Sequence, residues 1–561
     1  MKLLFHFSIL FIVILFYPSC TAHTDVKLKK GMVIRQSITI KKDTFFLSGA
    51  DTSSMPVITI EGDDIVVDFN GAVLIGSQDY DQPHTFTGLG IEIKSGKNIT
   101  IKNVVVRGYK VGLIATGIDS LEILDSDFSY NYRQLLKSTR EKEDLSDWMS
   151  YHHNDKEEWL RYGMAVYLRQ CDHALVRNVK VTGGQNGLMM TGCNHGLFYN
   201  NYFSFNSGIG LGMYRSSFNK VMHNNLDWNI RGFSFGQYNR GQDSAGILMY
   251  EQCNENIIAY NSATHSGDGF FLWAGQSTMD SGKGGCNNNV VYENDFSYAS
   301  NNGIEVTFSG GNNFYNNKLQ ECDYGIWGGY SYEMEIMGND FENNNYSIAI
   351  EHGNNTKISH NLFTKNKKGI KLFERDQKPA SWYFANNRNV ASREYQITNN
   401  VFSDMDEFFQ IENTEAVTIS NNVFYKANIP IDYYSSLPTK LENGNTTFLK
   451  EEVLQGRQYM IMSNYGPYNF KYPALWLRKI EGNTYTFVIF GPFGNWKAVG
   501  GEGFIMMSQK TGSIPATLVL EAENLATNLA IELEYFGDSF VDEFGVGQKK
   551  GKPVKLRWRK E

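Results

Sequence analysis

Aromatic and acidic side chains recur at equivalent positions of short alternating segments between residues 212 and 352. Two carboxyl groups that flank a glycosidic bond can cleave it, one by protonating the leaving oxygen and the other by activating water. Aromatic rings offer broad apolar surfaces on which sugar rings can stack. The pattern therefore predicts a carbohydrate site, whose catalytic candidates are Glu305, Glu351, Asp268, His265 and Glu251.

Polar and aromatic neighbours of these residues complete the predicted site. His265 and Asp268 stand on the turn that leads into Trp273, and further charged residues come from two segments that interrupt the pattern nearby. Functional groups that gather beside insertions of neighbouring segments indicate a single site. The predicted substrate-binding residues are Tyr214, Arg215, Tyr250, Trp273, Trp327, His352, Arg240, Asp243 and Lys283.

A glycoside hydrolase is the function that this pattern favours. Glu305 and Glu351 are the preferred acid and base, and they lie two repeats apart, roughly 10 Å along a stack of strands. With side chains that converge, this spacing favours the inverting mechanism, whose carboxyl groups are about 6.5 to 9.5 Å apart. Glu251, Asp268 and Asp243 are the substitutes.

Two other functions stay open. In a polysaccharide lyase or uronate epimerase, a cation neutralises the substrate carboxylate while a base removes the neighbouring proton. In a surface glycan-binding protein, the aromatic face binds sugar without catalysis. For the lyase or epimerase, the candidate cations are Arg215, Arg240 and Lys283, the candidate bases are His265, Tyr250 and His352, and the candidate ligands for Ca²⁺, the one cofactor considered, are Asp243, Asp268 and Asp280.

A 22-residue repeat positions these side chains. Each copy opens with a small residue and an aliphatic one, and an Asn follows 14 residues later, at Asn317, Asn339 and Asn361. A fixed period in this range indicates a solenoid, in which each repeat buries its apolar face against the next. Strand-like alternation with Asn at a bend predicts a parallel β-helix with Asn stacked on Asn at the corners.

The register extends in both directions and predicts about 12 coils within residues 21–440, interrupted at 131–161, 233–245, 274–289 and 373–395. The first interruption is expected to be partly helical, and long insertions on a rigid scaffold tend to carry function. Residues 445–561 alternate without the period and predict an antiparallel β-sandwich that caps the open end of the helix, or alternatively binds carbohydrate. The Asn position recurs at Asn103, Asn178, Asn201, Asn225, Asn261, Asn294, Asn400 and Asn422.

The small residue that opens each coil sets the phase of its strand. The first and third residues after it are apolar, as in the pair Ile247 and Met249. Since strand side chains alternate, the second and fourth residues must face outward. One outer face is thus predicted to carry Tyr214, Tyr250, Trp273, Glu305, Trp327 and Glu351.

The net charge of −8 over 561 residues argues against non-specific binding to nucleic acid, and a poly- or oligosaccharide is the predicted partner. Residues 1–20 carry a Lys, an apolar run and then Cys20, which is typical of a lipoprotein signal peptide. Cleavage before Cys20 and acylation of its thiol would follow secretion across the inner membrane and anchor the protein at the cell envelope or surface, with plain secretion as the alternative. The other five Cys show neither disulfide nor zinc spacing and are expected in the core.

From about residue 30 to about residue 435, the repeats resemble the right-handed parallel β-helices of the pectate lyase and polygalacturonase superfamily. The resemblance implies a right-handed parallel β-helix that holds a polysaccharide in a groove along one sheet. Together with the antiparallel β-sandwich predicted for residues 445–561, it makes the fold all-β. It assigns no catalytic residue, because neither the paired Asp of polygalacturonases nor the calcium-binding Asp and Arg pattern of pectate lyases stands at a matching position.

Overall fold

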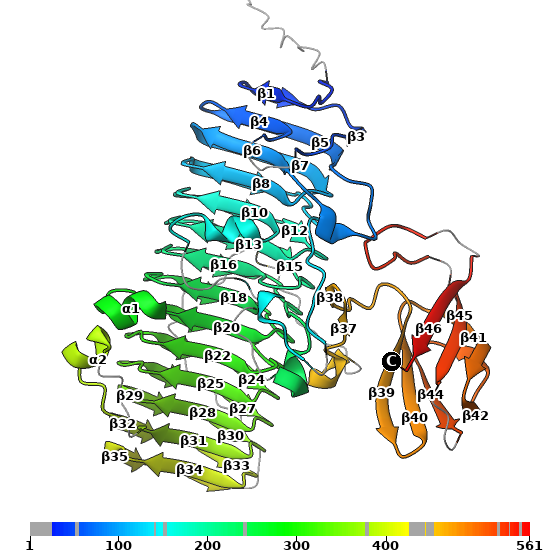
Figure 1. Ribbon diagram of the computed structural model, residues 1–561. Helices are drawn as coiled ribbons and strands as arrows, with labels where there is room; N and C mark the ends of the chain where they lie inside the picture. Colours follow the sequence, from blue (N-terminus) through cyan, green and yellow to red (C-terminus); the bar gives the residue numbers. More distant parts are fainter. Residues whose placement is uncertain are drawn as a thin grey trace, which may run out of the picture.

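Short parallel strands stacked in three sheets wind into one long coil in the computed structural model (Figure 1). The structure describes residues 25–50, 55–139, 142–147, 149, 154–238, 244–375, 381–425, 444, 454–523, 528–537, 539–548 and 552–560. Sheet 1 has fourteen strands: β1 (Met32–Ile34), β4 (Ile58–Glu61), β6 (Leu89–Ser95), β8 (Val111–Thr116), β10 (Met164–Arg169), β13 (Asn186–Thr191), β16 (Leu211–Tyr214), β18 (Ala245–Tyr250), β20 (Asp268–Trp273), β22 (Asn302–Thr307), β25 (Tyr324–Gly329), β28 (Tyr346–Glu351), β31 (Lys368–Phe373) and β34 (Glu407–Glu412).

Sheets 2 and 3 close the coil. Sheet 2 contains β2 (Ile38–Thr39), β3 (Thr44–Phe46), β5 (Ile65–Ile75), β7 (Lys97–Arg107), β9 (Asp119–Leu124), β11 (Leu175–Arg177), β14 (Leu197–Tyr199), β17 (Lys220–Met222), β19 (Ile257–Ala259), β21 (Val290–Tyr292), β23 (Asn313–Tyr315), β26 (Glu335–Met337), β29 (Asn354–Ser359), β32 (Arg393–Thr398) and β35 (Glu415–Ser420). Sheet 3 comprises the pair β12 (Lys180–Val181) and β15 (Tyr202–Phe203), followed by β24 (Lys318–Gln320), β27 (Asp340–Glu342), β30 (Leu362–Thr364), β33 (Val401–Ser403) and β36 (Val423–Tyr425).

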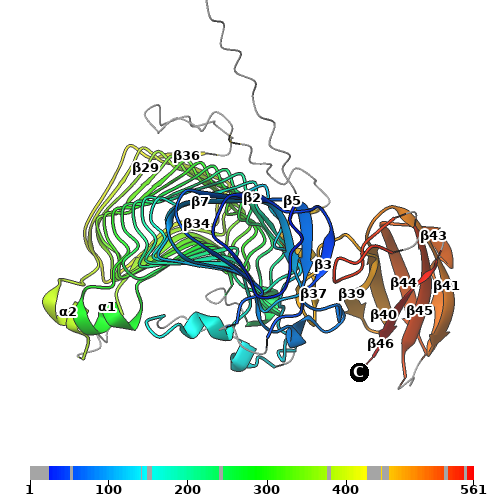
Figure 2. The same ribbon diagram turned by 90° about the horizontal axis from the view of Figure 1, so that it is seen from above.

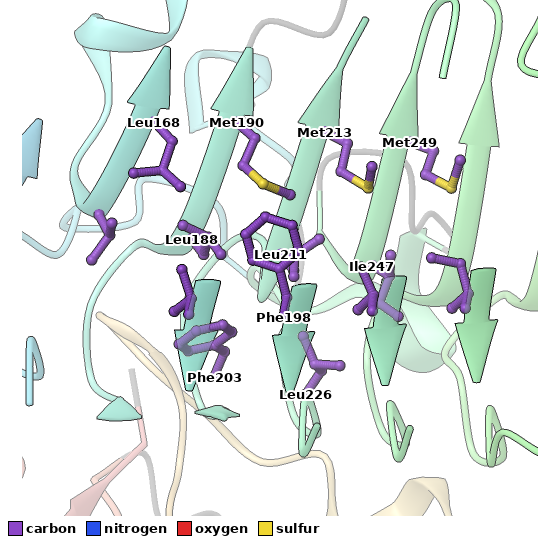
Figure 3. Close-up of a cluster of buried hydrophobic side chains, with 14 of the residues drawn as sticks. Leu168, Leu188, Met190, Phe198, Phe203, Leu211, Met213, Leu226, Ile247 and Met249 are labelled. Carbon is purple, nitrogen blue, oxygen red and sulfur yellow. The ribbon is translucent and has the colours of Figure 1, made fainter. Parts of the chain in front are cut away.

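The core fills the space between the three sheets. In sheet 1, Leu188, Leu211 and Ile247 pair in register on successive strands, and Met190, Met213 and Met249 form a parallel row. Figure 3 shows both rows directed toward the buried rings of Phe198 and Phe203 on the other walls. Every coil therefore buries its apolar side chains against those of the next coil, as the repeat predicts.

A continuous ladder of buried Asn side chains fixes one corner of the coil. Each Asn donates from Nδ2 to the Oδ1 of the Asn one coil further on, at 2.9 to 3.1 Å, and the same oxygen accepts the backbone N–H of the first Asn. Nδ2 also donates to a backbone carbonyl, so the buried polar groups of the corner are satisfied. The ladder runs through Asn201, Asn224, Asn261, Asn294, Asn317, Asn339, Asn361, Asn400 and Asn422.

The predicted ladder is wrong at three positions. Asn103 and Asn178 lie one residue before the ladder position, with φ of 58° and 54°, and donate to nearby Asp side chains instead. Asn224, not Asn225, occupies the ladder in its coil. Sheet 1 has fourteen strands, one from each coil, whereas the sequence predicts about 12 coils. The difference arises because the first coils have no Asn at the corner by which they could be recognised.

The predicted interruptions leave the coil on the outer side of sheet 1. The first one includes the short 3₁₀ helices Leu145–Asp147 and Glu158–Arg161, the third contains α1 (Gly275–Ser281) and the fourth contains α2 (Tyr383–Asn387). Helices α1 and α2 contact each other at one edge of sheet 1. Figure 2 shows this helix pair at one corner of the coil and the first interruption, in cyan, along the neighbouring face.

The C-terminal part forms an antiparallel β-sandwich, as predicted. After the pair β37 (Met462–Ser463) and β38 (Gly466–Pro467), one sheet holds β39 (Ala474–Glu481), β40 (Thr484–Phe490), β44 (Ala516–Ala522) and β42 (Phe504–Met507). The other sheet holds β43 (Thr511–Ser513), β41 (Gly494–Glu502), β45 (Ala530–Gly537) and β46 (Val554–Arg559). Their facing residues, among them Phe487, Trp496 and Leu533, form a separate core.

The sandwich lies beside the helix and not over its end (Figures 1 and 2). Tyr465 bonds to His84, Arg133 donates to the carbonyl of Pro467, and Phe470 packs against Trp228. These contacts reach coils in the first and middle parts of the helix. The expected capping role is therefore wrong, because the described residues that precede the sandwich contact these coils and not the last one.

The five Cys other than Cys20, namely Cys171, Cys193, Cys253, Cys286 and Cys322, are buried thiols, as expected. Within the described ranges, no helix combines the length and the apolar character needed to cross a membrane. The predicted signal segment and Cys20 lie outside the described residues.

Replacing Asn317 by Ala tests the ladder. The change leaves the backbone N–H of Asn294 and the carbonyl of Val291 without partners inside the corner. We expect a loss of roughly 2–5 kcal/mol in the free energy of unfolding, measured by urea denaturation. Asn422→Ala, at the partly exposed end of the ladder, is the control and should cost about 1 kcal/mol or less. Equal losses of unfolding free energy in the two variants would contradict the idea that burial of the ladder makes its hydrogen bonds important for stability.

Candidate active site

The outer surface of sheet 1 has the phase that the repeats predict. Ile247 and Met249 point into the core, and Leu248 and Tyr250 face outward. Register then defines three outward rows. The central row holds Leu248, Phe271, Glu305, Trp327, Ala349 and Lys371, the trailing row holds Tyr214, Tyr250, Trp273, Thr307, Gly329, Glu351 and Phe373, and the leading row, made of the first residues of the strands, holds Asp268, Asn302, Tyr324, Tyr346 and Lys368.

The first interruption covers the N-terminal half of this face. Met149, Trp159 and Tyr162 pack with outward residues of β8 to β20 in a second apolar cluster outside the coil. Tyr214 and Tyr250 are consequently only 1% and 0% exposed. These two predicted stacking surfaces are side chains of this outer core, so they are not available to a sugar in this structure.

An ion-pair chain fastens the same interruption to the sheet. Arg215 bonds to Asp155 at 2.6 Å and to Glu251 at 3.1 Å, and the ring of Tyr214 lies under its guanidinium. Glu251 is fully buried. Because the charge of Arg215 is used by two carboxylates, Arg215 and Glu251 act here as structural groups.

The outer face opens from β25 onward. Tyr324 stacks on Tyr346 with ring centroids 5.1 Å apart, and Trp327 meets Tyr324 edge to face at 5.1 Å. All three rings are partly exposed. Lys371 lies beyond them, with its Nζ 5.8 Å from the Tyr346 centroid and 4.7 Å from that of Phe373. This half of the face therefore presents aromatic rings and a cation.

Glu305 and Asp268 meet at the boundary between the covered and the open half. Asn302 joins them: its backbone N–H donates to Asp268 Oδ1 at 2.9 Å, and its Nδ2 donates to Glu305 Oε2 at 2.7 Å. Asp268 is 0% exposed and Glu305 is 4% exposed. In the central row, Glu305 stands between Phe271 and Trp327.

This environment disfavours the charged form of Glu305. Burial is the main cause that raises the pKa of Glu305 well above its ordinary range, and the negative charge of Asp268 raises it further. The hydrogen bond from Asn302 acts in the opposite direction and is the smaller effect. A carboxyl group whose pKa is raised in this way can serve as a general acid.

Glu351 and His352 have structural partners on the edge of the face. Glu351 Oε1 lies 2.9 Å from Arg375 Nε. The His352 ring bonds to the Val390 carbonyl through Nδ1, and its Nε2 accepts the backbone N–H of Arg375. Both residues thus hold the fourth interruption in place, and Glu351 does not join Glu305 in a pair.

His265 belongs to a stack on another corner of the coil. Its ring lies between Trp228, at 4.0 Å between centroids, and Tyr298, at 4.6 Å. Complete burial lowers the pKa of His265 to about 3. Such a ring stays neutral at ordinary pH and is enclosed, which argues for packing and against proton transfer to a substrate.

The family model for the right handed beta helix region matches residues 152–281 and 237–389. The chain is a right-handed parallel β-helix protein. Similar solved structures include a point mutant of the periplasmic alginate epimerase AlgG (13% identity, 70% of this chain and 85% of that chain, TM-score 0.43). Others are the Azotobacter vinelandii mannuronan C-5 epimerase AlgE6 A-module (11%, 70% and 91%, TM-score 0.39) and the catalytic domain of a GH87 alpha-1,3-glucanase mutant in complex with tetrasaccharides (14%, 65% and 64%, TM-score 0.37). The search of curated proteins found no match.

The remaining predicted residues of this β-helix protein lie around the boundary. Trp273 ends β20 beside Gly275, where a Cβ would come within 3.1 Å of the Trp273 Nε1, Glu251 Oε1 and Tyr250 hydroxyl atoms, so glycine lets α1 approach closely. Lys283 and Asp280 are exposed near the end of α1. Arg240 and Asp243 lie outside the described residues. Among the residues that are described, no group of three or more His, Cys, Asp or Glu is arranged to hold a metal ion.

Sequence reasoning missed the leading row. Asn302, Tyr324 and Tyr346 each stand just before the small residue from which the strand phase was counted. Strict alternation counted back from Glu305 assigns this position to the core, whereas Asn302 reaches Glu305 on the outer face because alternation breaks at the small residue. The sequence did contain a signal for this row: Asn302 is followed at the equivalent positions of the next two coils by Tyr324 and Tyr346.

His265→Phe tests the structural assignment of that histidine. A pKa lowered from 6.5 to about 3 means that the unfolded chain binds the proton more tightly, so this group's contribution to stability is lost as pH falls from 6.5 toward 3. The full effect is on the order of 5 kcal/mol. We measure the free energy of unfolding by urea denaturation at pH 7 and pH 4. The variant should lose less stability between these two pH values than the unchanged protein does, and it should keep any enzymatic turnover.

The exposed His173, which pairs with Asp119, supplies the control. His173→Phe should lose as much unfolding free energy between pH 7 and pH 4 as the unchanged protein does. A His265→Phe variant that folds but has lost turnover would assign His265 to catalysis instead.

Proposed function

We propose that this protein is a glycoside hydrolase that cleaves a poly- or oligosaccharide on the open half of sheet 1. The observation that carries the proposal is the buried Glu305, bound through Asn302 to Asp268 and followed in its row by Trp327. Its pKa is raised by burial, and a carboxyl group with a raised pKa at the start of an aromatic face can serve as a general acid.

The residues divide the reaction between them. Glu305 donates its proton to the glycosidic oxygen as the bond to the leaving sugar breaks. Asp268 is the base that takes the proton of the attacking water, a role that requires it to become accessible, because it is 0% exposed in this structure. The step consumes one water and cleaves one glycosidic bond. Asn302 holds both carboxyl groups in position, and Trp327 and Tyr324 stack on the sugar rings.

A lyase or epimerase is the second candidate, and Lys371 favours it. This partly exposed cation has no carboxylate partner within the described part of the chain and could neutralise an acidic sugar. The bases expected for that reaction support it less: His265 is enclosed, both nitrogens of His352 are engaged and Tyr250 is buried. Tyr324 is on the open face, but burial raises its pKa, which suits an acid better than a base.

Product analysis separates these candidates. The similar structures act on alginate or alpha-1,3-glucan by name, so these two polymers form the first panel, one acidic and one neutral. A hydrolase releases reducing ends without ultraviolet absorbance, a lyase forms an unsaturated product that absorbs, and an epimerase changes neither. A pure binding protein would leave both polymers intact while being retarded by them.

Glu305→Gln tests the general acid. The amide keeps the shape and the hydrogen bond to Asn302 but has no proton to donate. We expect turnover to fall by about 10²- to 10⁴-fold with substrate binding preserved, as measured by reducing-end release and by equilibrium binding. Glu351→Gln is the matched control, since it removes only a contact to Arg375 and should change turnover less than tenfold. Full activity in Glu305→Gln would exclude the proposed role.

The pH dependence of stability tests the same carboxyl group without a substrate. Because the folded protein binds the Glu305 proton more tightly than the unfolded chain, stability is present below the unfolded pKa, about 4.3, and is lost as pH rises through the raised folded pKa. Glu305→Gln cannot ionise. Its free energy of unfolding should match that of the unchanged protein near pH 4 and exceed it increasingly at higher pH. A constant difference across this range would show that Glu305 titrates normally.

A further inference from the structure

A cleft of about 510 Å³ lies where the β-sandwich meets the β-helix. One wall is formed by residues 233–237 of the second interruption and by residues 458–462 of the connecting segment. The other wall is formed by the edge strands of the two sheets of the sandwich, β39 and β46, which lie next to each other. A cleft of this size at a junction of domains is a common form of ligand site.

Aromatic and hydrogen-bonding side chains line the cleft together. Phe235 is exposed, and Trp476 and Trp558 are partly exposed. Gln237, Gln458 and Arg478 supply exposed amide and guanidinium groups. Rings that offer a flat apolar surface beside amide and guanidinium donors suit a sugar chain, which has apolar faces and hydroxyl groups around its rim.

The cleft adjoins the candidate active site through Arg457. The guanidinium of Arg457 lies 4.8 Å from the Phe235 ring centroid, at the wall of the cleft. Its Nη1 donates to Asp323 at 3.1 Å and to the carbonyl of Ser300 at 3.4 Å. Asp323 directly precedes Tyr324, and Ser300 lies two residues before Asn302. One side chain thus connects the cleft to the leading row.

We propose that the junction cleft binds the sugar chain beyond the acid pair, so that the sandwich contributes distal subsites for a polymeric substrate. This inference rests on the proposed function, because it assigns the occupant as a further part of the same polysaccharide.

A peptide strand pairing with the edge of β39 is the alternative occupant. The side chains of the cleft favour a glycan, because four aromatic rings lie beside three polar side chains, whereas pairing with a strand would take most of its affinity from the backbone of β39. Substitution of side chains therefore separates the two occupants.

The test uses the full chain carrying Glu305→Gln, so that bound polymer is not cleaved. Binding is measured by retardation in native gels containing alginate and by sedimentation with alpha-1,3-glucan particles. Trp476→Ala in this background should weaken binding of the retained polymer on the order of tenfold. Arg478→Gln and Gln237→Ala, at exposed positions, should weaken it as well and are independent of any folding defect at Trp476.

Phe493→Ala is the matched control, since Phe493 is 84% exposed on the same sandwich and does not line the cleft. In the active chain, the cleft variants should lower kcat/KM for the polymer and leave that for a trisaccharide unchanged. Cleft variants that bind as tightly as Phe493→Ala would overturn the inference while the hydrolase stands. Absence of binding to either polymer by the Glu305→Gln chain would overturn it too. Weakened binding without turnover in the active chain would support the cleft and refute the hydrolase.

Discussion

The buried Asn ladder is the interaction on which the structure of the coil depends. A corner inside a stack of coils encloses backbone N–H and C=O groups that water cannot reach, and leaving them unpaired would cost several kcal/mol per coil. Each Asn satisfies a neighbouring N–H, a carbonyl and the next Asn at once, so the coils can meet in one register only. A shift of one residue would turn Glu305 and Trp327 into the core and their apolar neighbours to the outside. The ladder therefore determines which side chains share the outer face.

The first interruption determines which outward residues of sheet 1 are buried and which remain accessible. Its N-terminal rows carry Met189, Tyr214, Leu248 and Phe271, which would expose a broad apolar surface, and the first interruption buries them in a second core. The cover ends near Phe271, where the row continues with Glu305. One neighbour of this carboxyl group thus belongs to a dry region and the other to the open face. Burial on one side with access on the other is the condition under which a carboxylic acid stays protonated and can still reach a substrate.

The sequence pattern predicts the coil, but it does not predict that the first interruption covers the N-terminal half of sheet 1. Residues that repeat, such as Asn317, Asn339 and Asn361, reveal both the ladder and the phase of the strands, because each coil meets the same constraint. Trp159 and Met149 belong to a segment without a period, so nothing in their spacing shows that they lie on Tyr214 and Tyr250. His265 follows the same logic, since its stacking partners Trp228 and Tyr298 are known only once three coils are superposed. The sandwich packs beside the helix through individual contacts, such as that of Tyr465 with His84, and no repeat in the sequence predicts them.

The bridging residue Asn302 gives the acid pair its asymmetry. Asp268 accepts a hydrogen bond from a backbone N–H, which stabilises the charged form of a carboxylate and has a fixed direction. Glu305 accepts a side-chain amide hydrogen bond through one oxygen, while its row places it between two aromatic residues. Burial therefore disfavours a charge on Glu305, and the negative charge of Asp268 opposes ionisation of Glu305 further. Under the proposed function, the acid and the base are thus distinguished by their surroundings, and exchanging the two residue types alone would not exchange their roles.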